Sequence, residues 1–214
     1  MFTANGANTC YDIRMNPIRY VLLVLLFLTQ FAPAFAEKIS LRDLSAYLNG
    51  ITTAEFEFSQ INDDGSVSQG KIYIKRPGRM RFEYNPPNNA LVLASSGRLA
   101  IFDDKGNQDP VIYPLKRTPL AIILAKNIDL ASSHMVVGHE VEGAVTVVSV
   151  EDPGHPDQGR VELVFIGPEP VLRQWVVRDA NGGTTTMILG DFQTGMALGS
   201  SLFNITHNTN ARRN

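Results

Sequence analysis

The pattern of apolar and polar positions along the chain changes its period after residue 50. Residues 40–50, SLRDLSAYLNG, place their apolar side chains on one helical stripe, with Ser40 in a capping position and Gly50 at the end. From residue 54 onwards apolar and polar residues alternate, which is typical of strands that bury one face. The sequence therefore predicts one amphipathic helix followed by a mainly β domain with few helices.

Turn residues divide this alternating sequence into short predicted strands. Asp64-Gly65, Ser96-Gly97 and Gly182-Gly183 are among the tight turns that separate them. Because such turns join antiparallel neighbours, we expect one large antiparallel sheet or an open barrel. The predicted strands span residues 54–60, 70–76, 80–84, 90–94, 98–103, 111–113, 135–142, 144–150, 160–166, 171–178 and 184–192, with a last short strand at 202–206.

One segment departs from the strand pattern. Thr118 and Pro119, a capping residue and a first-turn proline, precede LAIILAKN at residues 120–127. We expect a helix that is apolar on nearly all sides and therefore packs against apolar partners. The alternative is a buried strand, since Ile-Ile-Leu is also common in strands.

An arginine lies at the end of an apolar strand face. In the run KIYIKR, residues 71–76, Ile72 and Ile74 share one face, and Arg76 has the same phase. Arg79 and Arg81 fall on the opposite face of the following strand. Arg76 would either donate to carbonyls at helix ends or cover the apolar rim with its stem, and the pattern alone favours neither.

The N-terminal residues have the layout of a secretory signal peptide. Residues 20–31, YVLLVLLFLTQF, are apolar, follow a basic residue at Arg19 and precede a small-residue site that ends at Ala36. The apolar core is shorter than the roughly 20 residues of a membrane-spanning helix. We expect cleavage after Ala36, with an uncleaved anchor as the alternative, and Met15 offers a second start with a more usual signal length.

The remaining residues, 37–214, suit a single domain. The chain carries 19 basic and 21 acidic residues, so it has no basic excess for binding nucleic acid or an anionic membrane surface. Its single cysteine, Cys10, precedes the predicted cleavage site, which leaves the domain without a disulfide or a thiol-linked lipid. We expect a soluble monomer in the periplasm.

No motif for catalysis or metal binding stands out. The four histidines, His134, His139, His155 and His207, lack the spacing of a zinc site, and the sequence has no nucleophile elbow or phosphate-binding glycine loop. We therefore expect no catalytic residue, metal or cofactor. A small periplasmic hydrolase stays open as an alternative, because carboxylates from distant strands can meet.

The predicted sheet has a large apolar face and only two predicted helices to cover it. It either closes on a packed core or curves around an apolar cavity for a hydrophobic ligand. For the second case the sequence predicts a cavity within a set of apolar strand residues. These are Phe56, Phe58, Ile72, Ile74, Met80, Phe82, Tyr84, Leu91, Leu93, Leu99, Ile101 and Trp175, with Phe58, Ile74, Phe82, Leu93 and Trp175 expected at the cavity wall.

Several stretches resemble the periplasmic outer-membrane lipoprotein carriers, the LolA-like proteins. The most specific are Phe58-Ser59-Gln60 and RPGRMRFEY at residues 76–84. The resemblance continues through residues 91–102, 118–120 and 172–183 and covers most of the domain. Family members often carry an aromatic residue soon after the Arg-Pro pair, where this chain has Gly-Arg-Met.

The resemblance implies a half-open antiparallel β-barrel closed by an α-helical lid. Its apolar interior would hold the acyl chains of lipoproteins on their way from an inner-membrane ATP-driven lipoprotein-releasing complex to an outer-membrane acceptor, either a receptor or the membrane itself. Arg76 would be the lid latch, a side chain that holds the empty form closed. Pro119, Leu120, Ile123 and Leu124 would belong to the lid helix. A periplasmic lipid or glycolipid carrier on the same fold is the alternative.

Overall fold

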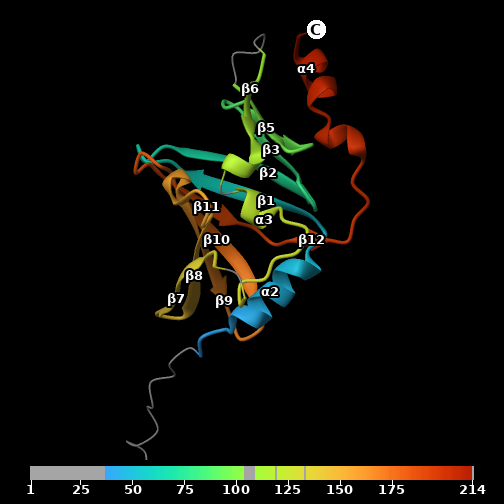
Figure 1. Ribbon diagram of the computed structural model, residues 1–214. Helices are drawn as coiled ribbons and strands as arrows, with labels where there is room; N and C mark the ends of the chain where they lie inside the picture. The colour runs from blue at the N-terminus through green and yellow to red at the C-terminus, as the bar shows by residue number, and fades with distance from the viewer. Residues whose placement is uncertain (1–36, 104–108, 119, 133, 214) are drawn as a thin grey trace, which may run out of the picture. The chain divides into compact units, whose positions relative to one another are not determined.

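The computed structural model (Figure 1) describes residues 37–103, 109–118, 120–132 and 134–213. The predicted signal peptide and Pro119 lie outside the described residues. The described part is mainly β, with one twelve-stranded antiparallel sheet and three α-helices. The mainly antiparallel β fold expected from the alternating pattern is therefore confirmed.

In the sheet, β1 to β6 lie side by side in sequence order, β7 to β11 do the same, and β1 pairs with β11 where the two groups meet. The order is β6-β5-β4-β3-β2-β1-β11-β10-β9-β8-β7, and β12 pairs with β1 beside β11. Within the described residues no pairing joins β6 to β7, so strand pairing does not close the sheet into a barrel. The strands are β1 (Thr53–Ile61), β2 (Val67–Lys75), β3 (Arg79–Tyr84), β4 (Leu91–Ser95), β5 (Arg98–Phe102), β6 (Val111–Pro114), β7 (Val136–Glu142), β8 (Val145–Glu151), β9 (Arg160–Ile166), β10 (Val171–Arg178), β11 (Thr184–Leu189) and β12 (Gln193–Thr194).

The first helix, α2 (Leu41–Gly50), forms as its pattern predicts. The Ser40 side chain accepts a hydrogen bond from the backbone N–H of Asp43 at 3.1 Å, which satisfies one donor of the first turn. Leu44 and Leu48 are buried from this helix against the sheet. The N-terminal cap and the apolar stripe, both local features, are enough to define it.

The segment after Thr118 forms α3 (Leu120–Ile123), so the helical expectation was right and the strand alternative was wrong. The helix makes only one turn. Directly after it, the Leu124 carbonyl accepts a hydrogen bond from the N–H of Gly78 at 2.9 Å, outside the helix. Ile122, Ile123 and Leu124 are buried in the same apolar cluster as α2. The two helices thus cover the same face of the sheet.

The predicted last strand at residues 202–206 was wrong. This stretch contains the end of a 3-10 helix (Ser200–Phe203) and the start of α4 (Ile205–Arg213). Asn204 caps α4, since its side-chain oxygen accepts from the N–H of His207 at 2.9 Å. An asparagine before a turn of polar residues favours a helix start over a strand.

Apolar residues of the sheet separate into two clusters on its opposite faces. The main cluster, defined here as the buried residues beneath α2 and α3, contains eight predicted cavity residues: Phe56, Phe58, Ile72, Ile74, Met80, Phe82, Leu99 and Trp175. Leu91 and Leu93 instead form the second cluster with Ala100, Phe102 and Ile205 of α4. The prediction that Leu91 and Leu93 belong with the other cavity residues was therefore wrong. Because β4 buries side chains on both faces, its alternation does not say which face is inward. Ile101 lies on the same face of β5 as Leu99, but its side chain is 37% exposed where β5 pairs with the edge strand β6.

Arg81 holds the C-terminal segment against the sheet. Its Nη1 donates to the Leu202 carbonyl and to the Asn208 side-chain oxygen, both at 2.9 Å, and its Nε donates to Glu83 at 2.7 Å. The side chain is only 12% exposed. Arg81 therefore has a structural role, although it lies on the polar face of β3.

We expect Arg81→Leu to loosen residues 200–213 without unfolding the sheet. Hydrogen bonds from a charged donor contribute roughly 1.5–3 kcal/mol each, so amide hydrogen exchange in α4 should accelerate by at least about tenfold. Arg79→Leu is the matched control, since within the described residues the Arg79 side chain makes no hydrogen bond. Unchanged exchange in α4 would show that its other contacts, among them the packing of Ile205 and the bond from Arg212 to the Asn89 carbonyl, hold the segment without Arg81.

Candidate functional site

The guanidinium of Arg76 binds the chain that follows α3. Arg76 comes directly after β2, and its backbone N–H donates to the Thr52 carbonyl at 2.8 Å. From there Nε and Nη2 both donate to the carbonyl oxygen of Ala125, at 3.0 and 2.9 Å. Nη2 also lies 3.5 Å from the Lys126 carbonyl oxygen. Two of the three guanidinium nitrogens are thus directed at one peptide group.

The same guanidinium binds the C-terminal end of α2. Nη1 donates to the Leu48 carbonyl and lies 3.4 Å from that of Ile51, while Nη2 donates to the side-chain oxygen of Asn49 at 3.0 Å. The last carbonyls of a helix have no partner within the helix and carry the negative end of its dipole. Arg76 therefore joins the end of α2 to the segment after α3.

The charge of Arg76 is balanced by dipoles. Among the described residues no carboxylate forms an ion pair with it. Partial burial lowers the pKa of the guanidinium from its usual value, but an arginine of this kind still stays protonated at any physiological pH. Since neutral carbonyls hold it, the contact can open without leaving a buried carboxylate unpaired.

Sequence reasoning missed two further side chains that join α2 to residues 125–130. The Asn49 amide donates to the Ile128 carbonyl at 2.7 Å and accepts from the Ile128 N–H at 3.0 Å. The Ser45 hydroxyl accepts from the N–H of Leu130 at 2.9 Å. A polar residue on the buried side of an amphipathic helix was the available signal for Ser45, because such a group needs a partner.

The main cluster beneath these contacts is rich in aromatic rings. Phe56 stacks on Phe192 with ring centroids 4.0 Å apart and meets Trp175 edge to face at 6.4 Å. Phe58 makes edge-to-face contacts with Phe82 and Tyr84 at 5.9 and 5.2 Å. Of the five residues expected at a cavity wall, the structure brings together four, and only Leu93 lies elsewhere.

An open apolar pocket of about 250 Å³ lies at the edge of the main cluster. This volume is below the roughly 300–1,000 Å³ of typical small-molecule sites. Leu120 of α3 forms part of the wall, so movement of α3 would enlarge the pocket. The residues around it are Gln60, Phe82, Tyr84, Val92, Leu99, Thr118, Leu120, Trp175, Val177, Thr185 and Met187.

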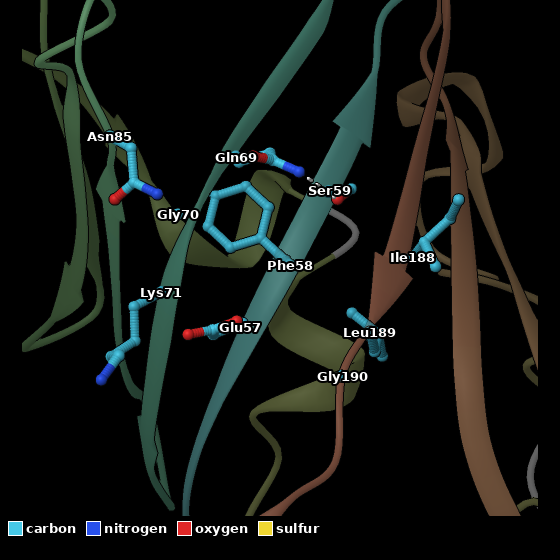
Figure 2. Close-up of a pocket in the computed structure, with 10 residues that line it drawn as sticks. All are labelled: Glu57, Phe58, Ser59, Gln69, Gly70, Lys71, Asn85, Ile188, Leu189 and Gly190. Atoms are coloured by element: carbon cyan, nitrogen blue, oxygen red, sulfur yellow. Dashed lines mark hydrogen bonds between the residues drawn. The ribbon is translucent and has the colours of Figure 1, made fainter.

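A second pocket, of about 330 Å³, lies over β1, β2 and β11 (Figure 2). Its wall includes Glu57 and Lys71, together with the polar side chains of Ser59, Gln69 and Asn85. Charged groups disfavour a hydrocarbon ligand, because binding would remove them from water. The pocket beside Leu120 is therefore the better candidate for an apolar ligand.

The described residues contain no group of three or more His, Cys, Asp or Glu side chains that could hold a metal. His155 pairs with Asp152 at 3.1 Å, and His139 Nε2 lies 2.9 Å from the Ile39 carbonyl oxygen. None of the helices in this part of the chain is long and apolar enough to cross a membrane. In this part of the chain, Arg76 thus joins α2 to the segment after α3, and both lie over the main cluster.

Comparison with known proteins identifies the family of this chain. The family described as outer membrane lipoprotein carrier protein LolA matches residues 49–206. The outer-membrane lipoprotein carrier proteins of Dechloromonas aromatica and Methylococcus capsulatus are 28% and 24% identical, over 91% and 88% of this chain and 95% and 93% of theirs. A LolA superfamily protein from Nitrosomonas europaea is similar in structure, with a TM-score of 0.42 and 9% identity over 78% of this chain and 98% of that one. Because the family match spans more than half of its residues, the chain belongs to the outer-membrane lipoprotein carrier family, whose members are transport proteins and not enzymes.

Proposed function

We propose that this chain is a periplasmic carrier that binds the acyl chains of lipoproteins and moves them from the inner to the outer membrane. It would receive cargo from an inner-membrane ATP-driven releasing complex and deliver it to a receptor or directly to the outer membrane. The observation that carries the proposal is the position of Arg76, which binds α2 and the segment after α3 at once, beside the main apolar cluster.

Acyl chains bind strongly enough that release needs a driving force. One chain of about 16 carbons gains on the order of 12 kcal/mol on leaving water, at roughly 0.8 kcal/mol per methylene. A rigid cavity of matching shape would hold such a ligand too tightly for a carrier. The empty form must therefore be stabilised by contacts that the loaded form lacks.

The bonds of Arg76 are such contacts. The pocket of about 250 Å³ beside Leu120 must widen to take an acyl chain, and the adjoining α3 would move for it. That movement would draw the Ala125 carbonyl away from Arg76 while α2 stays in place. Arg76 would thus act as the lid latch, with Leu120, Ile123 and Leu124 in the lid and the eight main-cluster residues around the acyl chains.

Binding of an apolar ligand can be tested directly. We expect the purified protein to bind a fluorescent fatty-acid analogue, and Leu120→Asp to weaken that binding at least about tenfold, because a carboxylate in the pocket wall would lose water on ligand entry. Fluorescence titration measures the effect. Lys116→Asp, next to α3 but outside this pocket, is the control and should bind normally.

The cargo can be identified by mass spectrometry of material extracted from the protein after isolation from cells. Acylated lipoproteins in the extract, together with lipoproteins retained at the inner membrane after depletion, support the proposal. Phospholipid or glycolipid alone, with normal lipoprotein sorting, would instead favour a lipid carrier on this fold. Absence of any apolar ligand would contradict both.

A further inference from the structure

Two polar side chains lie in the inward-facing rows of the sheet, at the end of the strands away from Arg76. Gln60 continues the row of Phe56 and Phe58 in β1, and Tyr84 continues the row of Met80 and Phe82 in β3. Both belong to the wall of the apolar pocket beside Leu120. An apolar pocket with a few polar groups in its wall is the usual design of a site that orients a partly polar ligand.

The two side chains form a connected series of hydrogen bonds. The Tyr84 hydroxyl donates to Gln60 Oε1 at 2.6 Å, and Gln60 Nε2 donates to Asn62 Oδ1 at 2.5 Å. Asn62 Nδ2 in turn donates to the Ser66 hydroxyl at 2.9 Å. The series runs from the pocket wall to the turn between β1 and β2, so it holds the Gln60 amide in one orientation.

A glycine lets these side chains meet across an intervening strand. Gly70 of β2 is paired with Phe58 on one side and with Tyr84 on the other. Figure 2 shows the Phe58 ring lying across β2 beside Gly70, and a Cβ at Gly70 would come within 2.8 Å of that ring. Without a side chain there, Tyr84 reaches over β2 to Gln60.

The pair, which lies in the pocket wall, keeps unused hydrogen-bonding capacity. A primary amide has two N–H donors, and within the described residues only Asn62 accepts from Gln60 Nε2. The Tyr84 oxygen can accept as well as donate. Burial raises the pKa of Tyr84 to about 12, so the hydroxyl stays protonated at neutral pH.

We propose that Gln60 and Tyr84 bind the polar head of the cargo, namely an ester carbonyl that joins an acyl chain to the glyceryl group of an acylated cysteine. The Gln60 N–H donates to that carbonyl, Tyr84 holds the Gln60 amide in position, and the hydrocarbon lies among the apolar residues of the pocket. This inference rests on the proposed function and adds the chemical class that the site selects: acyl groups with a carbonyl, over plain alkyl chains.

Two matched ligands test it. One is a lipopeptide whose terminal cysteine carries a diacylglyceryl group, and the other is its dialkyl ether counterpart, which has no ester carbonyls. We expect Gln60→Leu to weaken binding of the ester form about 3- to 10-fold, the range for one neutral hydrogen bond, and of the ether form less than twofold. Tyr84→Phe should show the same selectivity with a smaller effect. Tyr113→Phe, at the exposed β6 edge, should bind both ligands normally.

Infrared spectroscopy measures the hydrogen bond to the ester carbonyl directly, and a purely structural role of Gln60 would leave the carbonyl band unchanged. With ¹³C-labelled ester carbonyls, the stretching band of the bound lipopeptide should lie at lower frequency in the unaltered protein than in Gln60→Leu, because only the unaltered protein donates a hydrogen bond to it. Equal losses for ester and ether, or an unchanged carbonyl band, would overturn the inference and leave the carrier proposal intact. Failure of the unaltered protein to bind either ligand would overturn the proposed function itself.

Discussion

Arg76→Leu is expected to fold and to accept lipid but to release it poorly. Leucine suits the apolar row of Ile72 and Ile74, both buried, so the sheet should tolerate it. Each bond from a charged donor to a carbonyl contributes roughly 1.5–3 kcal/mol, and Arg76 makes two such bonds to Ala125, from Nε and from Nη2. Losing two of them would make the closed empty form about 3–6 kcal/mol less favourable. In the loaded form the bonds to Ala125 are already broken, and the bonds to α2 are lost from both forms alike.

The measurement is transfer of a bound lipoprotein from the carrier to outer-membrane vesicles. We expect a rate lower by at least about a hundredfold, since 1.4 kcal/mol corresponds to a factor of ten. Arg76→Lys should be intermediate, because lysine keeps the charge but cannot direct several donors at two peptide groups. Arg79→Leu is the appropriate control, whereas Arg81→Leu is not, because Arg81 binds the C-terminal segment. Normal transfer by Arg76→Leu would exclude the latch.

Gly70→Ala is expected to destabilise the domain strongly. A Cβ at this position would lie 2.0 Å from the carbonyl oxygen of Glu83, a backbone atom that cannot move away by rotating a side chain. Overpacking in a core costs typically 1–3 kcal/mol, and a clash with backbone belongs at the upper end of that range. We expect about 3 kcal/mol less stability and a melting temperature lower by roughly 6–12 °C.

Gly50→Ala serves as the matched control, because a Cβ at Gly50 meets no atom within 4 Å and α2 would gain a better helix former. Urea denaturation of both variants measures the difference. Similar stability for the two variants would show that β2 and β3 can separate at Gly70 without loss. In that case the close approach of Phe58 and Tyr84 would not depend on the missing side chain.

The sequence by itself determined the local structure and the direction of the key side chain. The Ser40 cap and the apolar stripe predicted α2, and the alternation from residue 54 predicted most of the strands. The same alternation placed Arg76 in the row of Ile72 and Ile74. These features follow from interactions within a few residues, which the order of side chains records directly.

The tertiary structure decided which distant groups those side chains meet. Arg76 binds carbonyls 28 and 49 residues away, and no local pattern specifies which helix end or loop lies there. In β4 both faces are apolar, so only the packing of Ile205 on Leu91 and Leu93 showed that these residues face away from the main cluster. The alternation of β3 places Arg81 on the face opposite Met80 and Phe82, and only the structure shows that Leu202 and Asn208 bind it there. Partners of this kind depend on how the whole chain packs, because strand alternation sets a side chain's direction and leaves open what lies in that direction.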